Sequence, residues 1–203
     1  MVTARLAEGD VEGLQTLRHD AQRDHLALTT RGTDVRHPDA VQDLFAMATR
    51  DAPLDVFVHC AGITRITTLS QTSVDDYRDL VETNISGTFY CLKAAALQMK
   101  HQGKGGSIMV MTSINAQWPL ATQAVYSATK AAVESLAKTL AVELASHHIR
   151  VNVLAPGLID TPMSARAVGD PAIRHYLRSK QPLAGGPGRP EDCADACLLY
   201  TSP

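Results

Sequence analysis

Tyr126 and Lys130 are the residues whose types and spacing first suggest chemistry. They stand four positions apart in a helix-forming stretch that we expect to extend from Ala124 to about His147, so they share one helical face. An ammonium beside a phenol favours the phenolate and lowers the pKa of the phenol, which suits general acid/base catalysis. An exposed pair on a helix surface is the alternative, because Tyr-x3-Lys also arises by chance. The neighbouring motifs must therefore decide the meaning of the pair.

Composition argues against several classes of protein. The 203 residues, 45% of them hydrophobic, predict one domain over 1–203, and the net charge of −2 argues against nucleic acid as a partner. No apolar run approaches the roughly 20 residues of a membrane helix, and Met1 opens no signal-peptide pattern. We therefore expect a cytoplasmic protein with no membrane partner.

The cysteines have no paired CxxC spacing. We therefore expect no metal site, and we expect the thiols to be buried and reduced, as in a cytosolic protein. The four cysteines are Cys60, Cys91, Cys193 and Cys197.

Helical and strand-like segments alternate along the chain. Apolar spacing and capping residues predict helices that begin at Asp10, Pro38, Ser73, Ala124 and Pro190. Apolar runs predict strands at 26–28, 54–58, 107–111 and 149–154, after a possible strand end at 1–4. The glycines at 103–106 predict a turn, because a phosphate-binding loop should follow a strand, and the segment 163–188 is a polar tail. This alternation predicts a doubly wound, Rossmann-like parallel α/β sheet.

Polar and small residues follow the predicted strands at the points where they end. Asp34, Cys60-Ala61-Gly62, Ser113 and Pro156-Gly157 each come directly after a strand. Right-handed crossovers keep such strands parallel, so these endings should lie along one edge of the sheet. Ser113 precedes Tyr126 by a loop long enough to bring the hydroxyl beside the phenol. A serine hydrolase is disfavoured, because no Gly-x-Ser-x-Gly motif surrounds Ser113.

These pieces, in this order and spacing, resemble the short-chain dehydrogenase/reductase family over nearly the whole chain, and in particular members similar to 3-oxoacyl-carrier-protein reductases. The matching motifs are Thr33-Asp34-Val35, His59-Cys60-Ala61-Gly62 in place of Asn-Asn-Ala-Gly, Asn84, Ser113, Tyr126-x3-Lys130, Val151-Asn152-x3-Pro156-Gly157 and Asp160-Thr161-Pro162. The resemblance implies hydride transfer between a nicotinamide cofactor and a ketone or secondary alcohol.

The resemblance also implies a role for each catalytic residue. Tyr126 would be the general acid/base, and Ser113 would hydrogen-bond the substrate oxygen. Lys130 would hold the nicotinamide ribose and lower the pKa of Tyr126, while Asn84 would anchor a water that links Lys130 to solvent. As single residues, Asn84 and Ser113 could equally be a core amide and a turn hydroxyl. Their joint occurrence favours the catalytic interpretation.

The cofactor contacts follow from the same resemblance. Asp34 and Val35 would contact the adenine, and Ala61 and Gly62 would allow close approach of the cofactor. Arg5 stands where members that prefer NAD carry an acidic residue, so we expect NADP, with NAD as the alternative. The full set of expected cofactor-binding residues is Arg5, Asp34, Val35, Cys60, Ala61, Gly62, Tyr126, Lys130, Pro156, Gly157, Ile159 and Thr161.

The chain departs from the family pattern at both ends. The Thr-Gly-x3-Gly-x-Gly motif that follows the first strand and receives the pyrophosphate is absent, and a final strand is expected beyond Pro203. We therefore expect an incomplete domain that lacks its first strand, with exposed apolar surface on the neighbouring strands. A non-catalytic fragment or degenerate member, with a role in binding or assembly, is the alternative function.

The substrate and the assembly are the least specified properties. We expect a small carbonyl or alcohol substrate, selected by the loop after Pro162, by the stretch 174–180 and by Gln117 and Trp118. We expect a homo-oligomer, either a tetramer or a dimer, formed through the helices that carry Asn84 and Tyr126. His59 and Cys60 replace two asparagines, and we expect His59 to be structural because the motif places it on a strand.

Overall fold

Three parallel strands form the centre of the structure, a computed structural model that describes residues 11–201. β1 (Val56–His59), β2 (Gly106–Met111) and β3 (Ile149–Leu154) lie side by side in that order. Val56 pairs with Ser107, and Gly106 pairs with Ile149, so all three strands point the same way. Of the four strands predicted from apolar runs, those at 54–58, 107–111 and 149–154 are confirmed, as is the parallel α/β class. Their carboxyl ends meet at one edge of the sheet.

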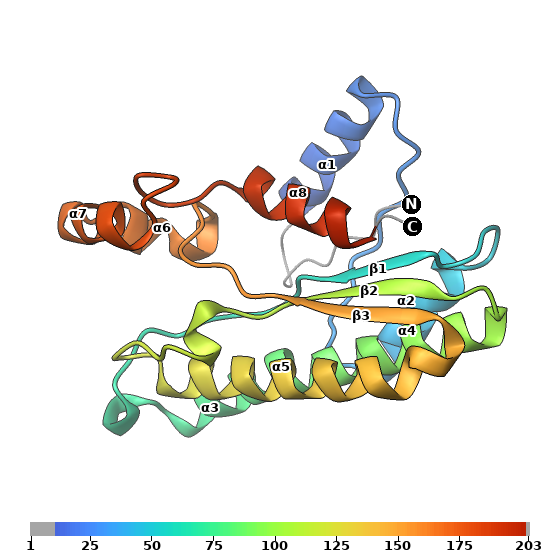
Figure 1. Cartoon of the computed structure of the whole chain (residues 1–203), viewed down its shortest axis with the longest axis horizontal. Helices are drawn as coiled ribbons and strands as arrows, with labels where there is room; N and C mark the ends of the chain where they lie inside the picture. Colours follow the sequence, from blue (N-terminus) through green and yellow to red (C-terminus); the bar gives the residue numbers. More distant parts are fainter. Residues whose placement is uncertain (1–10, 202–203) are drawn as a thin grey trace.

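Helices cover both faces of this sheet (Figure 1). α2 (Pro38–Ala48), α4 (Gly87–Gln102) and α5 (Ala124–Leu144) lie on one face, and α8 (Pro190–Thr201) crosses the other. α1 (Val11–Arg23) lies on the same side of the sheet as α8 in Figure 1. The end of α8 is held by the strands, because Ser107 and Arg150 both donate to the carbonyl oxygen of Tyr200, at 3.2 and 2.7 Å. This arrangement leaves the carboxyl edge of the sheet for a site.

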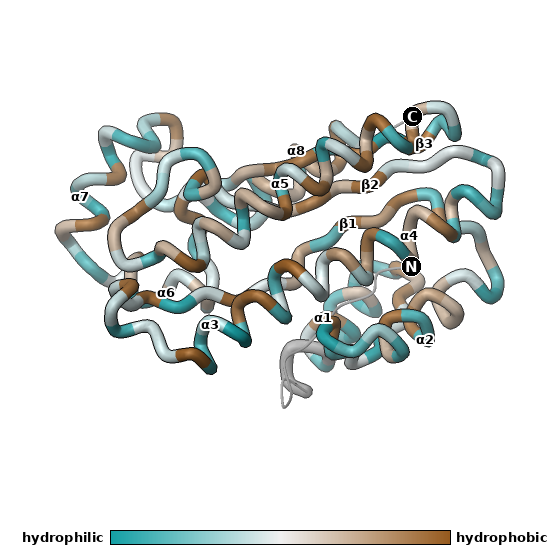
Figure 2. The backbone as a smooth tube through the Cα atoms, turned by 90° about the horizontal axis from the view of Figure 1, so that it is seen from below, coloured by the Kyte–Doolittle hydropathy of each residue, from teal (hydrophilic) through white to brown (hydrophobic). Residues whose placement is uncertain are grey.

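The hydrophobic core lies between the sheet and the α4–α5 layer. Figure 2 shows a run of hydrophobic residues along β2. β2 is the central strand and its residues are almost fully buried, whereas Val56 and Val58 of β1 are 40% and 39% exposed. The expectation of exposed apolar surface beside the sheet is thus confirmed on β1. The fully buried core side chains include Leu92, Met99, Ile108, Val110, Val133 and Ile149.

The helix that was predicted to begin at Ser73 is one long helical unit with an irregular middle. Ser73 caps α3 (Val74–Leu80) by accepting a hydrogen bond from the backbone of Asp76, as the capping pattern predicts. A π-helical segment, Val81–Ser86, then joins α3 to α4, which ends at Gly103 with φ of 64°. The small residues in the middle of this helix indicated close packing, but the sequence did not predict the π-helical segment. That segment brings Asn84 into the interior.

Two parts of the sequence-based fold need correction. No strand forms at 26–28, where Leu26 is 66% exposed, because a short apolar run becomes a strand only when a neighbouring strand pairs with it. The polar segment 163–188 contains α6 (Ala165–Val168) and α7 (Pro171–Lys180), which begins with Asp170 as its cap. The predicted strand end at 1–4 and the cofactor contact Arg5 lie outside the described residues.

The helices of residues 11–201 are either too short or too polar to span a lipid bilayer. The cysteines are free, as expected, but the expectation that they are all buried is wrong. Cys91 is buried under the sheet, whereas Cys60 at the end of β1 is exposed. The four thiols therefore differ in their exposure to solvent.

The core predicts the effect of a truncation on α4. Leu92 is 2% exposed, so Leu92→Ala should lower the free energy of unfolding by about 2–5 kcal/mol, as expected for a leucine that leaves a cavity. Urea unfolding monitored by circular dichroism measures this change. Leu183→Ala is the matched control, because Leu183 is fully exposed and should change stability by less than about 0.5 kcal/mol. Equal effects of the two substitutions would contradict the assignment of Leu92 to the core.

Candidate active site

Tyr126 and Lys130 occupy the first turns of α5, at the carboxyl edge of the sheet. The Lys130 Nζ lies 5.8 Å from the centre of the Tyr126 ring. Lys130 is only 7% exposed, and its Nζ donates to the backbone oxygen of Met111, the last residue of β2, at 3.1 Å. An ammonium has three donors, so this bond leaves two for another acceptor. The predicted helical pair is therefore a buried lysine with a half-buried tyrosine at the end of a strand.

Ser113 lies beside Tyr126, two residues after β2. The Ser113 hydroxyl lies close enough to the Tyr126 hydroxyl to lower the pKa of the phenol. Ser113 also caps a short 3₁₀ turn, because its Oγ accepts from the backbone N–H of Asn115 at 3.2 Å. The turn is tied to α5 by two amide contacts, from Asn115 to Gln123 and from Gln117 to Glu134, the latter at 2.9 Å. The hydroxyl of Ser113 is thus held at a fixed distance from the start of α5.

Asn84 connects the loop after β1 to α5. Its Oδ1 accepts from the backbone N–H of Ile63 at 2.8 Å, and its Nδ2 donates to the Ile63 carbonyl and to Thr129 Oγ1, both at 3.0 Å. Thr129 in turn donates to the carbonyl oxygen of Tyr126 at 2.7 Å. The side chain of Asn84 therefore joins Ile63, next to Gly62, to Thr129, the residue that precedes Lys130.

Gly62 lies against the two central polar groups of the site. A Cβ atom at Gly62 would stand 3.3 Å from Asn84 Oδ1 and 3.3 Å from Lys130 Nζ. This spacing is tight, and a larger side chain at position 62 would displace the ammonium. The glycine thus leaves the approach to Lys130 open from the end of β1.

The segment after β3 forms another wall of the same edge. The backbone N–H of Ile114 donates to the Pro156 carbonyl at 3.0 Å, which joins this segment to the Ser113 turn. Gly157 lies against Gln181, whose Oε1 would be 2.4 Å from a Cβ atom there. Ile159 and Thr161 follow, and both contact Ser164, which closes the next turn. The structure therefore brings 156–161 to the edge that carries Ser113.

Burial controls the electrostatics of the pair. Burial lowers the pKa of Lys130 to about 8, and the nearby Cys60 thiol acts in the opposite direction. Burial also raises the pKa of Tyr126 above 10.0, while the hydrogen bond from Ser113 lowers it. The expectation that the lysine charge lowers the tyrosine pKa is not met in this arrangement, because desolvation is the larger effect.

The remaining candidate residues lie on the adjoining segments. The Asp34 carboxylate pairs with Arg36 at 2.6 Å, and Val35 is buried where α4 comes close at Gly87. His59 is buried, and its Nε2 lies 2.9 Å from Thr88 Oγ1, a structural position as expected. Ala61 lies between Cys60 and Gly62 on the loop after β1.

Several supporting residues were not identified from the sequence. Thr129, Gln123 and Glu134 hold Asn84 and the Ser113 turn, but a threonine, a glutamine or a glutamate within a helix carries no motif. Their spacing from Tyr126 and Lys130 on one helix is the only signal that was available. These three residues support the site only through contacts with segments that are distant in the sequence.

Parallel strands between two helical layers, with a Tyr–Lys pair at their carboxyl ends, define a doubly wound α/β protein. A sequence model of a family described as Enoyl-(Acyl carrier protein) reductase matches residues 3–203. Gluconate 5-dehydrogenase of Gluconobacter oxydans is 32% identical over 194 residues, which are 95% of this chain and 75% of that protein. The 3-oxoacyl-[acyl-carrier-protein] reductase FabG of Chlamydia pneumoniae is 36% identical over 170 residues, 83% of this chain and 67% of that protein.

A solved structure has the same fold. The gluconate 5-dehydrogenase from Burkholderia cenocepacia, in complex with NADP and tartrate, superposes with a TM-score of 0.88 and 28% identity over 98% of this chain and 77% of that chain. The chain belongs to the short-chain dehydrogenase/reductase family.

The low pKa of Lys130 predicts a pH-dependent stability. The folded ammonium titrates near pH 8, whereas the ordinary value is 10.5, so between these values the unfolded chain binds more protons than the folded chain. The free energy of unfolding should therefore rise with pH through this window. Lys130→Met removes this component, so its stability relative to the native chain should be greatest near pH 7 and should decline towards pH 10.

Urea unfolding of both proteins at several pH values across this window measures the difference. Lys130→Met also removes the hydrogen bond to the Met111 carbonyl. This loss changes the free energy of unfolding by the same amount at every pH, so it does not alter how the difference between the two proteins varies with pH. Parallel pH dependences for the native chain and Lys130→Met would contradict the assignment.

Proposed function

We propose that this protein is an NAD(P)-dependent oxidoreductase that transfers a hydride between a nicotinamide cofactor and a ketone or secondary alcohol. The observation that carries the proposal is the grouping of the Tyr126 and Ser113 hydroxyls beside the buried ammonium of Lys130 at the carboxyl edge of the sheet. A phenol, a hydroxyl and an ammonium at one sheet edge provide a proton donor, an orienting group and a positive charge.

Tyr126 acts on the oxygen of the substrate. In reduction its Oη donates a proton to the carbonyl oxygen as the hydride reaches the carbonyl carbon, and in oxidation it takes the proton from the alcohol. Burial holds the pKa of Tyr126 above its ordinary value, which keeps the phenol protonated and ready to donate. Ser113 donates a hydrogen bond to the same substrate oxygen and fixes its position.

Lys130 holds the cofactor and adjusts the charge of the site. Its Nζ uses one donor on the Met111 carbonyl, so two donors fit the hydroxyls of a nicotinamide ribose. Gly62 leaves that approach free of side-chain atoms. The bound nicotinamide supplies the hydride in reduction and accepts it in oxidation. The fit supports a nicotinamide cofactor.

Other residues complete the cofactor site in this proposal. Ala61, Cys60 and the segment with Pro156, Gly157, Ile159 and Thr161 lie along the same edge as Lys130, and Asp34 and Val35 would meet the adenine. Asn84 positions Lys130 through the loop after β1, and a water held near it would link the ammonium to solvent. NADP is favoured over NAD because the related Burkholderia enzyme was solved with NADP and because Arg5 suits a 2′-phosphate.

The thiols support a reducing compartment. All four cysteines are free, and no disulfide joins any two of them within residues 11–201. We propose the cytoplasm as the location of the enzyme, in line with the expectation from the sequence.

Tyr126→Phe tests the proposed chemistry. Loss of the phenolic proton should reduce the rate of ketone reduction with NADPH by about 10²–10⁴-fold, because general acid catalysis contributes that much. NADPH binding, measured by the quenching of protein fluorescence, should be retained. Tyr77→Phe on α3 is the matched control, since this exposed tyrosine lies outside the site, and should keep full activity.

Two results would overturn the proposal. One is turnover of a ketone by Tyr126→Phe at the native rate. The other is tight NADPH binding without turnover of any ketone in a broad panel, which would favour the alternative of a non-catalytic binding protein.

We also propose that the enzyme is a homo-oligomer formed through α4 and α5. The outward surface of these helices is apolar, with Phe89, Leu97 and Val142 exposed. A shallow groove of about 360 Å³ lies between the helices, lined by Ile85, Ser86, Phe89, Tyr90, Ala132, Val133 and Leu136. A second copy related by a twofold axis would cover the same surface on both chains, forming a dimer or, with a further interface, a tetramer.

Phe89→Glu tests this interface. A charge in the apolar groove should shift the protein from a dimer or tetramer to a monomer, measured by light scattering after size-exclusion chromatography. Leu69→Glu places the same charge at an exposed leucine elsewhere and should leave the assembly unchanged. A native chain that is monomeric at micromolar concentration would end the proposal.

A further inference from the structure

α7 is fixed to the edge of the sheet that carries the candidate active site. The side chain of Gln181, directly after α7, accepts from the Leu158 N–H at 2.7 Å and donates to the Leu158 carbonyl at 3.1 Å. Leu158 belongs to the segment that the Pro156 carbonyl joins to Ile114, next to Ser113. The position of α7 is thus coupled through two hydrogen-bonded links to the serine of the site.

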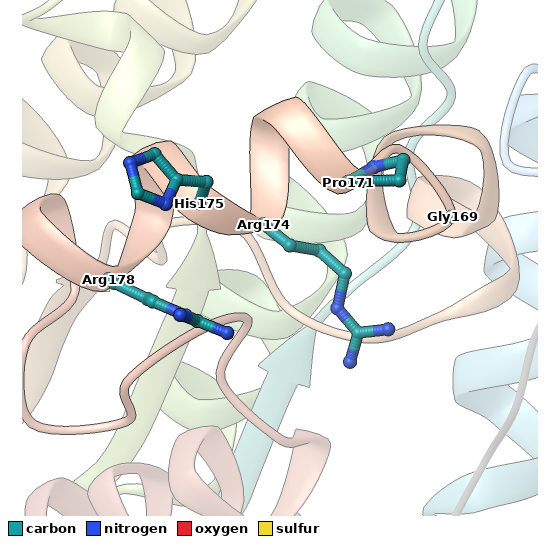
Figure 3. A pocket seen from close by; sticks show the side chains of 5 residues that line it. All are labelled: Gly169, Pro171, Arg174, His175 and Arg178. Atoms are coloured by element: carbon teal, nitrogen blue, oxygen red, sulfur yellow. The ribbon is translucent and has the colours of Figure 1, made fainter.

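An open cavity of about 480 Å³ lies along α7. It is lined by Gly169, Pro171, Arg174, His175 and Arg178 (Figure 3). Arg174 and Arg178 are four residues apart, and Figure 3 shows their guanidinium groups extending from the same side of the helix. The cavity falls within the size range of small-molecule sites.

These two arginines have no partner in the described part of the chain. Of the ten other arginines in residues 11–201, all except Arg50 and Arg166 form a side-chain hydrogen bond or ion pair: Arg18, Arg23, Arg31, Arg36, Arg65, Arg78, Arg150 and Arg189. Within residues 11–201, neither Arg174 nor Arg178 has such a contact. Like charges one helical turn apart repel, so this arrangement costs stability unless an anion offsets it.

The charge of the surrounding segment has the same sign. In a chain with a net charge of −2, residues 162–181 carry the cations Arg166, Arg174, Arg178 and Lys180. The single carboxylate there is Asp170, which is engaged by the backbone of α7, since it accepts from the Ala172 N–H at 2.8 Å. The segment that lines the cavity therefore carries more cations than carboxylates.

We propose that Arg174 and Arg178 form a subsite for the carboxylate or phosphate group of an anionic substrate. The inference rests on the proposed function and names the substrate class. A guanidinium matches a carboxylate or a phosphate with two parallel hydrogen bonds, and two guanidiniums on one face can hold both oxygens of the anion. The anion would anchor one end of the molecule at α7 and leave the carbonyl end for Ser113 and Tyr126.

Binding of an anion is tested without catalysis. Citrate titrated into the native protein by calorimetry should bind, and trimethyl citrate, its neutral ester, should not. The double variant Arg174→Gln, Arg178→Gln should bind citrate about tenfold more weakly or worse. Arg50→Gln is the matched control, since Arg50 is an exposed arginine without a described side-chain partner outside this segment, and Tyr126→Phe should bind citrate as the native protein does.

Kinetics then connect the subsite to the reaction. A long-chain oxo acid, whose carboxylate stands many bonds from its ketone, and the ethyl ester of that acid carry the same ketone with and without a charge. The double variant should raise the KM for the oxo acid about tenfold and change the kinetics of the neutral ester by less than about twofold. Failure of both ketones to react would count against the proposed function, while the citrate titration would still decide the subsite.

Three results would overturn the subsite. The first is no citrate binding by the native protein, and the second is equal citrate affinity for the native protein and the double variant. The third is arginine-dependent binding of a polyglutamate peptide without binding of citrate, which would assign this surface to an acidic protein partner.

Discussion

The structure depends on the side chain of Asn84 more than on any other polar group. Buried in a π-helical segment, it bonds to both backbone groups of Ile63 and to Thr129, and so holds the loop after β1 against α5. The backbone carbonyl oxygen of Asn84 accepts from the Thr88 hydroxyl, at 2.6 Å. Because that bond uses the hydroxyl hydrogen of Thr88, His59 must present an N–H from Nε2 to the same oxygen. Asn84, in the π-helical segment, thus holds the loop after β1 against α5, the helix that carries Tyr126 and Lys130.

Much of this arrangement was predictable from the sequence. Continuous apolar runs predict strands that are covered on both faces, and the sheet direction follows from the helices between them. Given parallel strands, Ser113 and Gly62 had to meet at one edge, and the spacing of Tyr126 and Lys130 placed both on one helical face. The motifs indicated which segments meet, because residues at strand ends are constrained by the topology.

The rest depends on contacts between segments that no local pattern encodes. The run at 26–28 has strand-like residues but no strand beside it, and the π turn at Asn84 is set by packing against α5. The sign of the pKa shift of Tyr126 follows from how deeply the ring is buried, which spacing to Lys130 does not reveal. The stretch 174–180 was recognised as important for the substrate, yet the missing partners of its arginines are visible only in three dimensions.

The register of the sheet also determines how the chain reaches this state. Each strand pairs with a neighbour about fifty residues away in sequence, as Val56 does with Ser107. The entropy of closing such loops must be overcome before any pairing is gained, so a sheet of this kind forms slowly. β2 has to bridge both outer strands, and helices that form earlier would wait for it with their apolar faces uncovered. Until β2 pairs with both neighbours, the apolar faces of those helices are therefore exposed to solvent and can associate with other chains.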